Sequence, residues 1–254
     1  MASVKQEISR LVNRLLASMN LKLLRLSDYK QIVEASPDPG RDIWRWVRET
    51  YSIKTVIDIG ANNGDFAEFL ACYFNAKQTY VFEPLPSYLS DLEGKAAKIP
   101  NLKIFNVALS DYEGEEFFYE NSYGPASSML RISELCKKEF PQTSGESEIK
   151  VKVCPLDDLL QSELESDQLE RDVFIKIDVQ GVEDRVIKGG KKLFSLGRCV
   201  LVEMSFVPLY KEQPLFEEVH DCLVELGYRF AGIKNQINSI KSGQPLFCHC
   251  LYVR

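Results

Sequence analysis

The sequence predicts a doubly wound α/β fold with a mostly parallel sheet. From residue 53 onward, short apolar runs alternate with helical segments, and glycine or proline stands at many of the changes. The runs lack the strict alternation of half-exposed strands, as expected where helices cover both faces of a parallel sheet. The chain has 254 residues, 45% of them hydrophobic, which suffices for a full core. The predicted strands are 53–59, 78–82, 102–107, 172–179 and 199–204, and the predicted helices are 64–74, 86–98 and 215–226.

Residues 1–50 are predicted to form a helical extension ahead of a domain that spans 51–254. Nine basic and six acidic residues make this stretch positive. Apolar residues recur at helical spacing along one stripe, at Ile8, Leu11, Val12, Leu15, Leu16 and Met19. Such a helix caps the domain or lines a contact between copies of the chain, and a helix on a membrane surface is the alternative. A break at 36–40 precedes a second predicted helix from Asp42.

The composition favours a cytoplasmic protein that does not bind nucleic acid. A net charge of -6 and an isoelectric point near 5.2 argue against a general nucleic-acid binder. Seven scattered cysteines form no C-x-x-C pair, which is typical of reduced thiols. No apolar run reaches the 18 or so residues that a transmembrane helix needs, and charged residues interrupt any secretory signal near the N-terminus.

The turn after the first predicted strand indicates a binding site. Gly60 ends the strand and Gly64 precedes the helix, in G-x-x-x-G spacing rather than the G-x-G-x-x-G of a dinucleotide site. Asp58 precedes the turn, and an acid would repel a pyrophosphate but tolerate a ligand with ammonium and sulfonium groups. Glu83, at the end of the second strand, can accept both hydroxyls of a ribose. Together these residues predict S-adenosylmethionine (SAM) as the cofactor.

The stretch between Asp111 and Asp157 interrupts the alternation of strands and helices. Residues 116–119 and 149–153 look like two additional strands, so an inserted hairpin with a long loop is predicted. The part of the loop around Ser127 is predicted to bind a ligand, and the polar tract 141–147 to be mobile.

A second group of charges stands at the end of the strand 172–179. Lys176 and Asp178 fall on one face of this strand, and Glu203 ends the next strand. Because ligands of doubly wound folds lie at the carboxyl ends of the strands, Asp178 is expected to open into the same crevice as Gly60 and Glu83. A structural ion pair of Lys176 with Asp178 or Glu203 is the alternative.

The motifs, in their order, resemble those of FkbM-type methyltransferases over about residues 53–252. They are Asp-Ile-Gly-Ala-Asn-Asn-Gly (58–64), Phe-Glu-Pro (82–84), Asn-Val-Ala-Leu-Ser-Asp-x-x-Gly (106–114), Ser-Ser (127–128), Ile-Lys-Ile-Asp-Val-Gln-Gly-Val-Glu (175–183) and Leu-Val-Glu (201–203). The resemblance implies a class I methyltransferase core, which is Rossmann-like. It also implies O-methylation of a sugar, glycolipid or natural-product hydroxyl with SAM as donor.

The same resemblance assigns roles to residues. Asp58, Gly60, Ala61, Asn62 and Gly64 would line the methionine side of the cofactor, Glu83 the ribose, and Ala108 with Asp111 the adenine. One departure is visible, because the family usually has Glu where Gln180 stands.

A hydroxyl acceptor must lose a proton, which requires a base near the cofactor. We expect Asp178 to be this base, with Glu203 or Glu183 orienting the acceptor and Lys176 tuning the charge. Tyr123, Ser127 and Ser128 are predicted to contact the acceptor, a plain turn being the alternative. No dedicated metal site is predicted, although the same acids could instead hold Mg²⁺. His220 and His249 are both expected to be structural.

Two other functions stay open at this stage. A nicotinamide-dependent oxidoreductase shares the fold and the ribose-binding acid but has a G-x-G-x-x-G turn. A non-catalytic protein that binds SAM would share the whole cofactor site.

Overall fold

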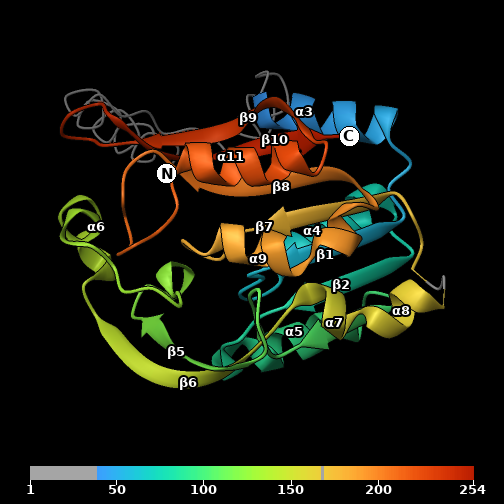
Figure 1. Ribbon diagram of the computed structural model, residues 1–254, viewed down its shortest axis with the longest axis horizontal. Coiled ribbons are helices and arrows are strands. Elements are labelled where there is room, and N and C mark those ends of the chain that lie inside the picture. Colours follow the sequence, from blue (N-terminus) through green and yellow to red (C-terminus); the bar gives the residue numbers. More distant parts are fainter. Residues whose placement is uncertain (1–38, 167–168) are drawn as a thin grey trace, which may run out of the picture. The chain divides into compact units, whose positions relative to one another are not determined.

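The computed structural model describes residues 39–166 and 169–254. Its main sheet has seven strands in the order β3-β2-β1-β7-β8-β10-β9 (Figure 1). The strands are β1 (Thr55–Ile59), β2 (Gln78–Phe82), β3 (Leu102–Phe105), β7 (Val173–Ile177), β8 (Gly197–Ser205), β9 (Arg229–Asn238) and β10 (Pro245–Val253). All neighbouring pairs from β3 to β8 are parallel, whereas β10 runs antiparallel to both β8 and β9.

The direction in which strands are added reverses at β1. The chain adds β2 and β3 on one side of β1, then returns to add β7 and β8 on the other. Loops leave such a switch point in opposite directions and open a crevice at the carboxyl ends of the strands. The predicted class I methyltransferase architecture, a Rossmann-like and mostly parallel sheet, is confirmed.

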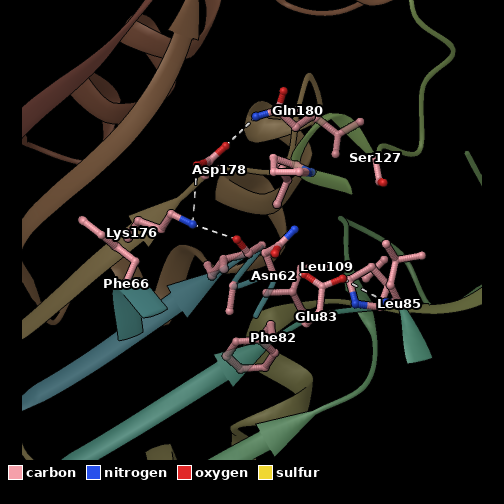
Figure 2. Close-up of a pocket in the computed structure, with 18 of the residues that line it drawn as sticks. Asn62, Phe66, Phe82, Glu83, Leu85, Leu109, Ser127, Lys176, Asp178 and Gln180 are labelled. Atoms are coloured by element: carbon pink, nitrogen blue, oxygen red, sulfur yellow. Dashed lines mark hydrogen bonds and ion pairs between the residues drawn. The ribbon is translucent and has the colours of Figure 1, made fainter. Parts of the chain in front are cut away.

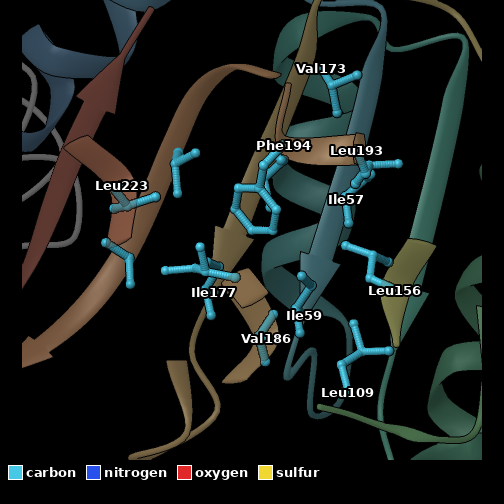
Figure 3. Close-up of a cluster of buried hydrophobic side chains, with 14 of the residues drawn as sticks. Ile57, Ile59, Leu109, Leu156, Val173, Ile177, Val186, Leu193, Phe194 and Leu223 are labelled. Carbon is cyan, nitrogen blue, oxygen red and sulfur yellow. The ribbon is translucent and has the colours of Figure 1, made fainter. Parts of the chain in front are cut away.

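Helices cover both faces of this sheet, as the apolar strands predict. One face packs against α3 (Pro39–Thr50), α4 (Asp65–Phe74) and α5 (Leu89–Ala96) through residues such as Val47 and Leu70. The other face packs against α7 (Leu156–Leu159), α9 (Glu183–Gly189), α10 (Lys191–Phe194) and α11 (Phe216–Glu225). Figure 3 shows Ile177 of the sheet among Phe194 and Leu223 of this second layer. Full burial of each such side chain contributes about 1.5–3 kcal/mol.

The inserted segment folds as a second sheet with the strand order β4-β6-β5. Its strands are β4 (Ala108–Leu109), β5 (Gly114–Asn121) and β6 (Glu146–Cys154), and β5 and β6 form the predicted antiparallel pair. Between them lie η2 (Gly124–Ala126), α6 (Glu134–Glu139) and η3 (Pro141–Thr143). The tract predicted to be mobile is folded here, because Asn121 donates its side-chain N–H to the carbonyl of Thr143 at 2.7 Å. Two further short helices are η1 (Pro86–Tyr88) and α8 (Gln161–Glu165).

The predictions for the N-terminal extension fall mostly outside the described residues. The amphipathic helix over residues 8–19 and the contact between chain copies lie in that part. The second predicted helix is α3, which begins at Pro39 rather than at Asp42. In the part of the chain that the structure describes, no helix combines the length and apolar character that a bilayer crossing requires.

Candidate functional site

A cavity of about 410 Å³ opens at the carboxyl ends of β1, β2 and β7, where the fold places ligands. Figure 2 shows that Glu83 and Leu85 approach it from the end of β2, and Lys176, Asp178 and Gln180 from the end of β7. The predicted site residues in its wall are Gly60, Ala61, Asn62, Glu83, Ala108, Ser127, Lys176 and Asp178.

Gly60 and Gly64 are required by the protein backbone rather than by close approach of a ligand. Gly60 has a φ of 73°, and a Cβ there would overlap the carbonyl oxygen of Asp178. Gly64 caps α4 in the left-handed conformation, and a Cβ would stand 2.6 Å from Leu92. Gly64 is not among the residues in the described cavity wall. The two glycines therefore shape the turn, and Gly60 lines the cavity together with the residues between them.

Glu83 is a buried hydrogen-bond acceptor in the cavity wall. Its carboxylate accepts the backbone N–H of Asn62 at 2.8 Å and that of Leu85 at 2.9 Å, so both oxygens are fixed in place. Burial raises the pKa of Glu83, and the two backbone N–H groups and Lys176 oppose this rise. Each oxygen keeps a second lone pair, which suits the two hydroxyls of a ribose. The predicted role of Glu83 is compatible with this geometry.

Beside Glu83 the wall is apolar. It consists of Phe82, Leu85, Val107, Ala108, Leu109 and Phe118. An adenine ring fits such a wall, and the adjoining carboxylate fits its ribose, so the residues present suit an adenosyl group. Asp111, which was predicted on the adenine side, is exposed and lies outside the described cavity wall.

Lys176 is a buried cation between the ends of β1 and β7. Its ammonium donates to the carbonyl of Gly60 at 2.7 Å and lies 3.1 Å from Asp58 and 3.6 Å from Asp178. Burial lowers the pKa of Lys176, but Asp58 and Asp178 outweigh it and hold the pKa above its ordinary value. Burial raises the pKa of Asp58, against the effect of Lys176. Asp58 is fully buried, so it would act on a cofactor only through Lys176 and the backbone.

Asp178, Glu203 and His249 converge at one point, and we call them the acid–histidine cluster. His249 Nε2 lies 3.7 Å from Asp178 Oδ2 and 3.6 Å from Glu203 Oε2. Asp178 and His249 line the cavity, whereas Glu203 lies outside its described wall. Burial raises the pKa of Asp178, yet Lys176 and His249 outweigh it and hold the pKa well below the usual range. Burial, Asp178 and Glu183 raise the pKa of Glu203 well above it.

His249 was predicted to be structural, but it lies in the cavity wall. His249 stands directly opposite Glu203 in the antiparallel pairing of β10 with β8. An acid near the end of one strand and a histidine on a later strand only weakly indicate a shared site in the sequence. Whether the two residues are neighbours depends on the strand order, which the sequence alone does not show.

Gln180 holds the two acids of the cluster. Its side-chain N–H groups donate to Asp178 Oδ1 at 2.6 Å and to Glu203 Oε1 at 2.9 Å. Its amide oxygen accepts from the Tyr210 hydroxyl at 2.8 Å, and its backbone carbonyl accepts from the Ser128 hydroxyl at 2.7 Å. Gln180 itself has a φ of 59°, which is uncommon for a residue with a side chain. Where the family usually has an acid, this chain therefore carries a neutral residue that orients two acids.

Glu183 is buried at the start of α9, outside the described cavity lining. Its carboxylate accepts the backbone N–H of Gly181 at 3.0 and 3.1 Å. Burial raises the pKa of Glu183 to about 7, against the effect of these hydrogen bonds. This position suits support of the loop after β7 rather than contact with an acceptor.

Of the three residues of the insertion that were predicted to contact the acceptor, only Ser127 lines the cavity. Its hydroxyl, however, donates to the carbonyl of Gly124 at 2.7 Å. The Ser128 hydroxyl donates to Gln180, as described above. Tyr123 is 48% exposed and lies outside the described cavity wall. In this structure Ser127 fixes the turn within the insertion, and Ser128 holds the insertion against the loop after β7.

Comparisons with known proteins agree with these motifs. The family model described as the methyltransferase FkbM domain matches residues 58–230. The 2-O-methyltransferase NoeI of Sinorhizobium fredii is 30% identical over 175 residues, which cover 66% of this chain and 70% of NoeI. The AMB antimetabolite synthetase AmbE of Pseudomonas aeruginosa is 26% identical over 158 residues, which are 53% of this chain and 7% of AmbE.

Among solved structures, the precorrin-6y C5,15-methyltransferase of Geobacter metallireducens aligns with a TM-score of 0.42 and 12% identity. The alignment covers 84% of this chain and 86% of that one. The family match extends over more than half of the chain and includes the turn after β1, Glu83 and the acids at the ends of β7 and β8. The chain therefore belongs to the FkbM family of SAM-dependent methyltransferases.

Proposed function

We propose that this methyltransferase transfers the methyl group of SAM to a hydroxyl of a sugar, either free or within a glycolipid or natural product. The observation that carries the proposal is that one cavity has an apolar wall suited to an adenosyl group and is also lined by Asp178 and His249 of the acid–histidine cluster. The likeness to NoeI, which is named as a 2-O-methyltransferase, supports oxygen as the acceptor atom.

The chain's own residues would divide the work as follows. Glu83 accepts hydrogen bonds from the ribose hydroxyls, and the apolar wall holds the adenine. When bound, SAM supplies an electrophilic methyl group with its own leaving group, so alignment of the acceptor contributes most, in favourable cases about 7–11 kcal/mol. The acceptor hydroxyl loses its proton at the acid–histidine cluster.

Asp178 takes a different part in this proposal from the base predicted from the sequence. Because its pKa is held below the usual range, Asp178 is anionic but a weak proton acceptor. Its negative charge would instead stabilise positive charge in the cluster as the acceptor hydroxyl loses its proton.

The experiment is a transfer assay with SAM that carries a ¹³C-labelled methyl group. The full chain is incubated with monosaccharides, oligosaccharides and glycolipids, and products are sought by mass spectrometry as a gain of one labelled methyl. The ¹³C chemical shift then distinguishes methyl on oxygen from methyl on nitrogen or carbon. Label on a sugar oxygen is the expected result, and label found only on nitrogen or carbon acceptors would overturn the proposal.

A further inference from the structure

We propose that the acid–histidine cluster binds one divalent cation of intermediate hardness, of the class of Mn²⁺, Fe²⁺ or Zn²⁺, with its open position toward the cavity. The inference rests on the proposed function and adds the group that would activate the acceptor hydroxyl.

The spacing of the three side chains carries the argument. Asp178, Glu203 and His249 each offer one ligand atom, and these atoms lie within 4.8 Å of one another. The distances of 3.7 and 3.6 Å from His249 Nε2 to the carboxylate oxygens are too long for hydrogen bonds. Bonds of about 2.0–2.2 Å to one cation would place neighbouring ligand atoms roughly 3–3.5 Å apart. A cation would therefore need to shorten the two distances from His249 Nε2 by only a few tenths of an ångström.

The other oxygen of each carboxylate is already occupied. Gln180 donates to Asp178 Oδ1 and Glu203 Oε1, which turns Asp178 Oδ2 and Glu203 Oε2 toward His249. Tyr210 in turn fixes the amide of Gln180. Hydrogen bonds that orient the ligands from behind are a regular feature of metal sites.

The histidine ring points to the same conclusion. Nδ1 of His249 is buried and has no hydrogen-bond partner among the described residues. Nε2 faces the two carboxylate oxygens, so a divalent cation placed between these atoms would take a lone pair from each of the three when the ring proton is on Nδ1.

Lys176 supplies only part of the positive charge that the cluster needs. Its ammonium lies closer to the Gly60 carbonyl and to Asp58 than to Asp178, at 2.7 and 3.1 Å against 3.6 Å. Asp58 is fully buried and lies 3.1 Å from Lys176. The single charge of Lys176 is thus shared between Asp58 and Asp178, which leaves net negative charge in the cluster for a divalent cation to balance.

The donor set decides the class of cation. Cys248 and Cys250 flank His249 but belong to the core on the opposite face of β10, so no thiolate reaches the cluster. Two carboxylates with one imidazole suit Mn²⁺, Fe²⁺ or Zn²⁺, whereas Mg²⁺ prefers oxygen ligands and water. Such a cation lowers the pKa of a bound hydroxyl and so promotes its deprotonation.

The test is Mn²⁺ binding to the full chain, measured without SAM or acceptor. The protein is stripped with a chelator, and bound Mn²⁺ is followed by the loss of the free-ion EPR signal. We expect one saturable Mn²⁺ per chain and at least tenfold weaker binding in His249→Ala and Glu203→Gln. His220→Ala is the matched histidine control, because His220 contacts Tyr252 away from the cluster, and it should bind as the unaltered protein does. Circular dichroism verifies that each variant folds.

Competing cations and methyl transfer complete the test. Zn²⁺ should displace Mn²⁺, and Mg²⁺ at the same concentration should not. No saturable binding, or equal binding by the His249→Ala variant, would overturn the cation site. If chelated protein still methylates a sugar hydroxyl at the full rate, the inferred role of the cation in activating the hydroxyl is wrong but the proposed function stands. If Mn²⁺ binds as expected and no hydroxyl is methylated, the proposed function is wrong and the cation site stands.

Discussion

The backbone of Gly60 at the end of β1 lies against the carbonyl oxygen of Asp178 just after β7, with no room for a Cβ between them. The left-handed φ of Gly60 adds to this requirement. We expect Gly60→Ala to lower the free energy of unfolding by about 3 kcal/mol or more, because both the overlap and the strained φ must be relieved. Urea denaturation measures the change. Gly94→Ala is the control, since a Cβ there meets nothing within 4 Å and a helical alanine should stabilise by up to about 1 kcal/mol.

Glu83 should control affinity for the cofactor. Glu83→Gln removes the charge that would bind the ribose hydroxyls, and loss of charged hydrogen bonds of about 1.5–3 kcal/mol predicts roughly 10- to 100-fold weaker SAM binding. Isothermal titration calorimetry measures the dissociation constant. Glu115→Gln on the exposed hairpin is the control. Unchanged SAM affinity in a folded Glu83→Gln variant would contradict the assignment.

Asp178 should matter for turnover more than for cofactor binding. Asp178→Asn keeps the shape of the side chain but removes its negative charge from the cluster. We expect SAM affinity within a few-fold of the unaltered protein and a fall in kcat of roughly 100-fold or more, as for other charged groups that act on the reacting atoms. Single-turnover transfer of labelled methyl provides the measurement, with the exposed Asp91→Asn as the control. A normal kcat would remove Asp178 from the reaction.

Glu183 should make stability depend on pH. Its pKa is raised from an ordinary value of 4.5 to about 7 in the folded protein, so the folded state holds its proton more tightly than the unfolded chain. The contribution of Glu183 to stability is therefore complete below pH 4.5 and is lost as the pH rises toward 7, by about 3 kcal/mol at most. The Glu183→Gln variant has no carboxyl group at this position, so it lacks this contribution to the pH dependence of stability. Urea denaturation from pH 4.5 to 7.5 should show the variant gaining stability relative to the unaltered protein, and parallel curves would count against the prediction.

Tyr210 should act on the reaction through Gln180. Tyr210→Phe removes the hydroxyl that lies 2.8 Å from the Gln180 amide oxygen and 3.1 Å from the carbonyl of Ala126. We expect a stability loss of about 1–2 kcal/mol and a clear fall in kcat with little change in KM. Tyr228→Phe is the matched control, because its hydroxyl donates to the carbonyl of Phe194 in the core. Tyr228→Phe should lose similar stability and keep its kcat, and the same kinetics in both variants would show that Tyr210 is only structural.

The parts of the site that the sequence predicts well are those that follow directly from one strand. Glu83 and Asp178 each come just after an apolar run, so the parallel sheet brings them to one edge. Boundaries are less predictable from the pattern alone. The strand expected to reach residue 107 ends at Phe105, because the Asn106 side chain donates to the carbonyls of Glu83 and Pro84 and turns the chain.

Other features depend on neighbours that only the folded chain supplies. His249 reaches the cluster because β10 pairs with β8 in antiparallel register, and nothing in the local pattern of β10 gives that register. The need for glycine at position 60 likewise comes from Asp178, which is distant in the sequence. Ser128 looks like a substrate contact from its motif, but its hydroxyl is bonded to Gln180.

The hairpin of β5 and β6 belongs to a sheet that shares no strand with the seven-stranded one. Its strand β5 supplies Phe118 to the cavity wall, and the segment between β5 and β6 supplies Ser127 and Met129. This part of the wall can thus be replaced by recombination without altering the strands that carry Glu83 and Asp178. Chimeric enzymes with junctions after Leu109 and before Leu156 would exchange this part between relatives, and altered acceptor choice with Glu83 still in place for the donor is the outcome this architecture allows.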